Sequence, residues 1–153
     1  MAYQNILVCL DSENEPTFHA YNEAIAFAKN ESATLYLCSI INTKAYGAMS
    51  RYDKNLIPNV KQKATDYLVH LHQRATTAGV NAQLIVDTGL PVQKIVKSVV
   101  PRYNIDLIIH GATGGNKIEK ALEGSISKGL IKKSQVDCLV VKPRTIKAGV
   151  NYA

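Results

Sequence analysis

The sequence predicts an α/β protein, a doubly wound five-stranded parallel sheet in the order 3-2-1-4-5 with helices on both faces. Apolar runs such as residues 5–10 and 106–110 lack the alternation of half-exposed strands, which indicates strands covered on both sides. Segments with helical spacing separate these runs, and such alternation is typical of parallel sheets with right-handed crossovers. A length of 153 residues suits one domain. We expect residues 1–143 to form it and residues 144–153 to be a C-terminal tail.

The first half of the chain contains two predicted strands and two predicted helices. After the strand at residues 5–10, Pro16 suits the first turn of a helix over 17–30, in which Ala20, Ala24 and Phe27 share one face. Residues 33–41 form the second strand. Residues 42–51 have no clear period, and we expect this segment to be the least ordered. A long helix follows from about residue 52 to 78, where Gly79 is well placed to end it.

The second half continues the alternation. We expect the third strand at residues 81–86, and Leu90-Pro91 opens a helix that Pro101 stops. The fourth strand spans residues 106–110. A helix starting at Gly124 or Ser125 runs to about residue 134, and residues 136–141 form the fifth strand.

Composition bounds the classes of protein that the chain can belong to. Hydrophobic residues make up 46% and charged residues 20%, which is ordinary for a globular protein. No signal peptide and no apolar stretch of membrane-spanning length is visible, so we expect a cytoplasmic location without membrane insertion. The three cysteines are far apart and odd in number, which favours buried thiols in a reducing compartment over a disulfide framework.

The placement of charged residues and histidines limits the classes of ligand that the chain can bind. From Lys117 to the end of the chain there are eight basic and three acidic residues, a balance that suits an anionic ligand or a solvated charged face. Basic and aromatic residues do not interleave, which disfavours nucleic acid. His70 and His72 are two apart on a predicted helix and face different ways, so we expect no metal site made of protein ligands alone.

The segment after the fourth strand carries the strongest functional signal. Parallel sheets bind ligands beyond the carboxyl ends of their strands, which selects the segments that begin at Asp11, Asn42 and Gly111. Gly111 and Gly114 precede Gly124-Ser125 at a predicted helix start. Glycines allow the backbone to approach a ligand, and a helix N-terminus offers unpaired amides, so the segment is a candidate anion cradle. No Gly-Lys-Ser/Thr motif follows, so the segment is not a P-loop. The alternative is a plain turn, which is what glycines after a strand most often form.

The spacing Gly111-x2-Gly114-x9-Gly124-Ser125 resembles the nucleotide-binding signature of the universal stress protein family, and nearly the whole chain follows that family's plan. The resemblance implies an ATP-binding protein in which these four residues hold the ribose and phosphates. The remaining positions that it implies are Cys9, Leu10 and Asp11 at the adenine and ribose end, Ile40 over the base, and the main chain of Ile126. Two alternatives stay open: Asp11 could instead cap the first helix, and Ile40 could be ordinary core.

The chain also departs from the family pattern. It lacks the histidine and arginine that many relatives carry just after the first motif glycine. Either Thr113, Asn116 and Lys117 replace their phosphate contacts, or those contacts are absent. His110 precedes that glycine on the strand, where we expect a packed or hydrogen-bonded imidazole rather than a catalytic base.

The sequence disfavours two other classes of protein. In a response-regulator receiver Asp11 and Asp87 would share magnesium, but two strand spacings put them roughly 10 Å apart in the expected order. An ATP-consuming enzyme needs metal-holding acids, and the motif loops supply only Glu119 and Glu123. We therefore expect a binding protein without catalysis, to which magnesium could come with ATP phosphates. Slow ATP hydrolysis and a nucleotide-independent interaction protein remain the alternatives.

The last predicted strand suggests a homodimer. It is apolar from Val136 to Val141 and would lie at the edge of the sheet, where an unprotected strand invites pairing. Pairing with the same strand of a second copy across a twofold axis would satisfy this edge, as the family resemblance also implies.

Overall fold

The computed structural model describes residues 2–10, 15–111 and 125–142, and these contain a five-stranded parallel sheet in the order β3-β2-β1-β4-β5. Its strands are β1 (Asn5–Cys9), β2 (Thr34–Asn42), β3 (Asn81–Gly89), β4 (Leu107–Gly111) and β5 (Asp137–Val141). The predicted strand order is confirmed, and β5 lies at one edge of the sheet. The predicted tail at residues 144–153 lies outside the described residues.

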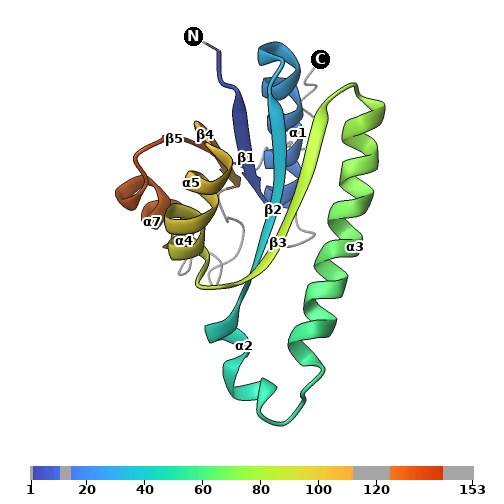
Figure 1. Cartoon of the computed structure of the whole chain (residues 1–153), viewed down its shortest axis with the longest axis vertical. Coiled ribbons are helices and arrows are strands. Elements are labelled where there is room, and N and C mark those ends of the chain that lie inside the picture. The colour runs from blue at the N-terminus through green and yellow to red at the C-terminus, as the bar shows by residue number, and fades with distance from the viewer. Residues whose placement is uncertain (1, 11–14, 112–124, 143–153) are drawn as a thin grey trace, which may run out of the picture.

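Helices cover both faces of the sheet (Figure 1). One face carries α1 (Glu15–Glu31) and α3 (Leu56–Thr77), and the other carries α4 (Pro91–Lys94), the π-helical turn η1 (Ile95–Val99), α5 (Val100–Tyr103) and α7 (Ser125–Lys133). A short helix, α2 (Thr43–Ser50), continues from the end of β2 beyond the sheet. None of the helices in the described part of the chain is long and apolar enough to cross a membrane.

Burial on both sides explains the continuous apolar strands. In β1, Ile6 and Val8 pack toward α1 and α3, while Leu7 and Cys9 pack toward α4, η1 and α7. All four are almost completely inaccessible to solvent. A polar residue at any of these positions would be buried against a helix, so the strand does not show the alternation of a half-exposed sheet.

Two long-range contacts hold the layers in register. The Asp106 carboxylate accepts hydrogen bonds from the backbone amides of Gln4 (2.8 Å) and Asn5 (3.0 Å), which fixes the start of β1 beside β4. On the helical layer, the buried Tyr21 hydroxyl donates to the Leu71 carbonyl at 2.8 Å and joins α1 to α3.

Three sequence-based expectations about local structure were wrong. The segment at residues 42–51 is helical as α2, because the Asn42 side chain caps it by accepting from the amides of Lys44 and Ala45. Helical structure continues past Pro101 to Tyr103, because a π-turn precedes the proline and loosens the usual ladder. The third strand extends to Gly89, because β3 pairs with the whole length of β2.

Candidate functional site

The strands end at different heights at the carboxyl edge of the sheet. β1 ends at Cys9, which is in register with Cys38 of β2 and His110 of β4. β2 continues to Asn42, and its residues beyond Cys38 are in register with β3 and have no register partner in β1. The end of β2 therefore overhangs the end of β1, at the edge of the sheet where parallel α/β proteins bind ligands.

A cavity of about 220 Å³ lies beside this overhang. Its lining comes from the end of β2, from α2 and α3, and from the first residues of α4 and α7: Ser39, Ile40, Ile41, Asn42, Ala45, Tyr46, Val60, Ala64, Pro91 and Ile126. Most of these side chains are apolar, with a hydroxyl, an amide and a phenol among them. The volume is below the roughly 300 Å³ at which ligand pockets usually begin, so it suits one ring system rather than a whole nucleotide.

Of the predicted site residues, the structure brings Ile40 and Ile126 together in this cavity, although they are far apart in the chain. Ser125 is the first residue of α7, as predicted for a helix start near that position. Cys9, Leu10 and Gly111 are buried at the ends of β1 and β4 and do not line the cavity. The backbone amide of Leu10 donates to the Cys38 carbonyl at 2.7 Å.

The other predicted residues, Asp11, Gly114 and Gly124, lie outside the described residues. The same is true of Thr113, Asn116 and Lys117, the positions named as replacements for phosphate contacts.

Sequence reasoning missed the contribution of α2 and of the start of α3. The signal that could have found α2 is Asn42, a favoured helix N-cap residue directly after a strand. Tyr46 and Ala45 lie in the first turns of that helix and line the cavity. Val60 and Ala64 are one helical turn apart on α3, a spacing that places both on the face toward the cavity.

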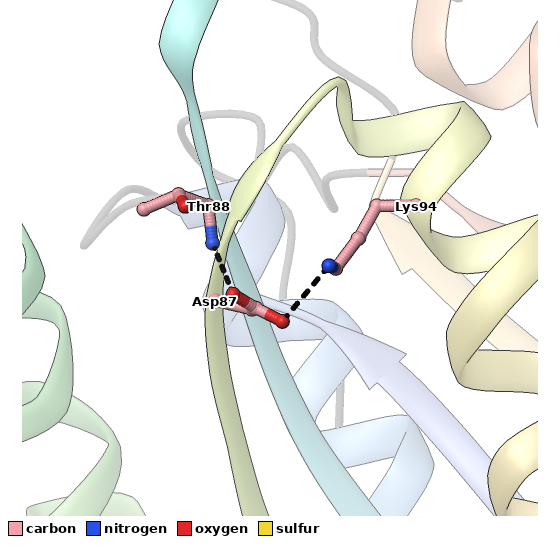
Figure 2. A network of polar contacts seen from close by, with 3 residues as sticks. All are labelled: Asp87, Thr88 and Lys94. Carbon is pink, nitrogen blue, oxygen red and sulfur yellow. Dashed lines mark hydrogen bonds and ion pairs between the residues drawn. The ribbon is translucent and has the colours of Figure 1, made fainter.

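A polar network joins the end of β3 to α4 (Figure 2). The Asp87 carboxylate accepts from the Thr88 amide at 2.8 Å and forms an ion pair with the Lys94 ammonium at 3.1 Å. The hydrogen bond from Thr88 and the nearby Lys94 lower the pKa of Asp87. Gly89 follows with φ of +147°, a conformation that favours glycine. Pro91, two residues after Gly89, lines the small cavity.

A second, larger cavity of about 620 Å³ adjoins this wall, between α4, η1 and α7. It shares Pro91 and Ile126 with the smaller cavity, and Lys97 and Lys133 also line it. The two lysines make the surroundings of this second cavity positive, which suits a ligand with negative charge.

His110 lies at the end of β4 and is only 7% exposed. Burial lowers its pKa from an ordinary 6.5 to about 4, so the imidazole is neutral at pH 7. The packed imidazole that the sequence predicted is confirmed. Within the described ranges, no group of three or more histidine, cysteine or acidic side chains could hold a metal ion.

The strand order also tests the alternative of a response-regulator receiver with a magnesium site. β2 lies between β1 and β3, so Asp87 is separated by two strand spacings, or roughly 10 Å, from the end of β1. The Asp87 carboxylate is paired with Lys94 rather than grouped with other acids. A magnesium site of the receiver type is not formed by the described residues.

Comparison with known proteins gives the family. The family model of the universal stress proteins matches residues 2–142. The chain belongs to the universal stress protein family. A relative from Staphylococcus aureus (strain USA300) that carries the family's name is 30% identical over 149 residues, which cover 97% of this chain and 89% of that protein.

Solved structures of other universal stress proteins share the fold. The universal stress protein UspA from Lactobacillus plantarum has a TM-score of 0.79 at 24% identity, covering 92% of this chain and 99% of that one. An Arabidopsis thaliana family protein solved with AMP bound has a TM-score of 0.62 at 15% identity, over 93% of each chain. A universal stress protein in complex with cAMP has a TM-score of 0.63 at 20% identity, over 94% of this chain and all of that one.

Proposed function

We propose that this universal stress protein is a regulatory protein that binds ATP at the carboxyl edge of its sheet. The observation that carries the proposal is the cavity in which Ile40 of β2 and Ile126 of α7 meet. An apolar recess of this size suits the adenine ring, while the sugar and phosphates would extend toward the segment from Gly111 to Ser125. The relatives solved with AMP and with cAMP support an adenine nucleotide as the ligand.

The proposed contacts follow the signature residues. Gly111, Gly114, Gly124 and Ser125 would hold the ribose and phosphates. Asp11, beside Cys9 and Leu10, would lie at the adenine and ribose end. Lys97 and Lys133, which line the adjoining cavity, supply positive charge on the same side of the sheet. Magnesium would be carried by the ATP phosphates, since the described residues offer no metal site of their own.

We propose binding without catalytic turnover, in the cytoplasm. Phosphoryl transfer needs acids that hold metal ions near the phosphates. Asp87, which lies opposite Ile40 in the β2–β3 register, is instead engaged by Lys94 and Thr88. A sensitive phosphate-release assay over hours tests this point. Turnover that is lost on mutation of a motif-loop side chain while binding persists would contradict it.

A homodimer through β5 completes the proposal. β5 is the edge strand next to β4, and most of its residues are half-buried in the single chain. Pairing two copies of this strand would satisfy its open hydrogen-bonding edge. Sedimentation analysis tests the stoichiometry, and the expected result is a dimer. A wild-type protein that sediments as a monomer at micromolar concentration would contradict the dimer.

The decisive experiment is a thermal-unfolding series with ATP, ADP, AMP and GTP. At about a hundred times its dissociation constant, a ligand that binds only the folded state adds roughly 2.7 kcal/mol to the free energy of unfolding. Gly124→Val should abolish the shift, because a branched side chain would occupy the proposed phosphate space; its ligand-free melting temperature is the folding control. The absence of any shift, with protein free of copurified nucleotide, would refute the proposed function.

A further inference from the structure

The helix α2 forms one wall of the small cavity, yet it has little support of its own. It has eight residues, and none of them is buried. Helices this short are marginal in water, and Gly47 in its interior lowers helix propensity by about 1 kcal/mol relative to alanine. The Asn42 cap at 3.0 Å and 3.2 Å fixes where the helix starts, but not how firmly the rest of it is held.

Tyr46 is the aromatic residue of α2 that lines the cavity. Its side chain is half-buried, whereas Met49 on the same helix and Tyr52 just after it are 61% and 93% exposed. Tyr46 shares the cavity with Ile40 and Ile126, so a ring placed there would have apolar and aromatic walls. Aromatic side chains stack on nucleobases of any identity, because every base presents a π-face.

Ser39 adds a polar residue to the lining of this cavity. It is only 4% exposed and directly precedes Ile40 on β2. A few polar groups among mostly apolar walls are typical of pockets that orient a ligand.

We propose that Tyr46 stacks on the base of the bound nucleotide, and that α2 is a lid whose order depends on this contact. The inference rests on the proposed nucleotide binding and adds to it a specificity-determining residue outside the glycine-serine signature. The lid selects for a planar heteroaromatic ring. A sugar phosphate without a base leaves Tyr46 without its partner and leaves α2 marginal.

Calorimetric titration of AMP into wild type, Tyr46→Leu and Tyr46→Phe tests the stacking. Tyr46→Leu should weaken AMP binding between about fivefold and about a hundredfold, the range that base stacking supplies. Tyr46→Phe keeps the ring and should bind nearly as well as wild type. Tyr52→Leu is the matched control, because it makes the same change at a solvent-exposed tyrosine. Ribose 5-phosphate, which has no base, should bind wild type and Tyr46→Leu equally.

Separate measurements test whether α2 acts as a lid. Hydrogen exchange of the α2 amides should slow when AMP binds wild type, and this protection should be lost in Tyr46→Leu. An added Cβ at Gly47 meets no atom within 4 Å, so Gly47→Ala should preorder α2 and tighten AMP binding by up to about fivefold. The chain has no tryptophan, so Tyr46→Trp introduces a single tryptophan whose fluorescence AMP should quench and ribose 5-phosphate should not.

The outcomes separate this inference from the proposed function. If wild type binds AMP and Tyr46→Leu binds it equally well, the stacking is wrong while nucleotide binding stands. If α2 exchange is unchanged by AMP in wild type, the lid is wrong. If wild type binds no adenine nucleotide at all, both the proposed function and the inference are overturned.

Discussion

His110 links the stability of the fold to pH through its buried imidazole. The side chain is 7% exposed at the end of β4, in register with Cys9 of β1 and Val140 of β5. Burial holds its pKa at about 4, against an ordinary value of 6.5 in the unfolded chain. Between these values the unfolded chain binds more protons than the folded one. The contribution of His110 to the free energy of unfolding is therefore fully present above pH 6.5, and it is lost as the pH falls toward 4.

The magnitude follows from the two pKa values. A difference of about 2.5 pH units corresponds to a maximum of about 3 kcal/mol, reached below pH 4. At pH 5 the imidazole accounts for a loss of about 2 kcal/mol relative to pH 7.5. Marginally stable domains have only about 5–15 kcal/mol in total, so this is a measurable share.

Urea unfolding at pH 7.5 and pH 5 measures the effect. His110→Asn and His110→Gln retain a polar side chain but do not titrate, and both should show a loss on acidification that is smaller than in wild type by about 2 kcal/mol. Asp87, whose pKa is also shifted, is common to all three proteins, so its contribution cancels. A variant that loses as much stability as wild type between these pH values would refute the buried neutral imidazole as the source.

Two further predictions concern the packing and the turn that shape the cavity walls. A Cβ at Gly129 would lie 2.9 Å from Val92 Cγ2. Gly129→Ala should therefore lower the free energy of unfolding by about 1–2 kcal/mol, because the cost of overpacking exceeds the gain in helix propensity. Val92→Ala should rescue it in urea unfolding; a neutral Gly129→Ala would contradict the close approach. Asp87→Asn should cost less than about 1 kcal/mol in the same assay, because the side chains of Asp87 and Lys94 are 46% and 31% exposed. A larger loss would mean that the pair organises the whole turn.

The fold could be predicted because its signal is local. Apolar runs such as Ile6 to Leu10 reflect burial on both faces, and that burial is a property of each strand taken alone. The end of the long helix at Thr77, just before Gly79 with its φ of +83°, also follows from one residue. The error at Pro101 has a local cause of another kind: the π-turn that admits the proline is rare and has no simple sequence signature.

The cavity could be predicted only in part, because its walls are assembled over long distances. Ile40 and Ile126 were reached through the family signature, whereas Ser39 and Tyr46 belong to no motif. Ser39 lies inside an apolar strand, and Tyr46 lies in a segment without a clear sequence period. Only the extension of β2 and the helix α2 together bring these two residues to one cavity. Val60 and Ala64 enter the site because α3 packs beside that overhang.

Helix packing and ligand binding are connected at the contact between α4 and α7. Gly129 lets α7 approach Val92 closely, and the same two helices contribute Pro91 and Ile126, which border both cavities. The Asp87–Lys94 ion pair adds a weak contact at the turn from which α4 begins. The wall formed by Pro91 and Ile126 is therefore held mainly by packing, while Tyr46 belongs to α2, which has no buried residue to anchor it. A ligand in the small cavity would close against a firm wall on one side and order a marginal helix on the other.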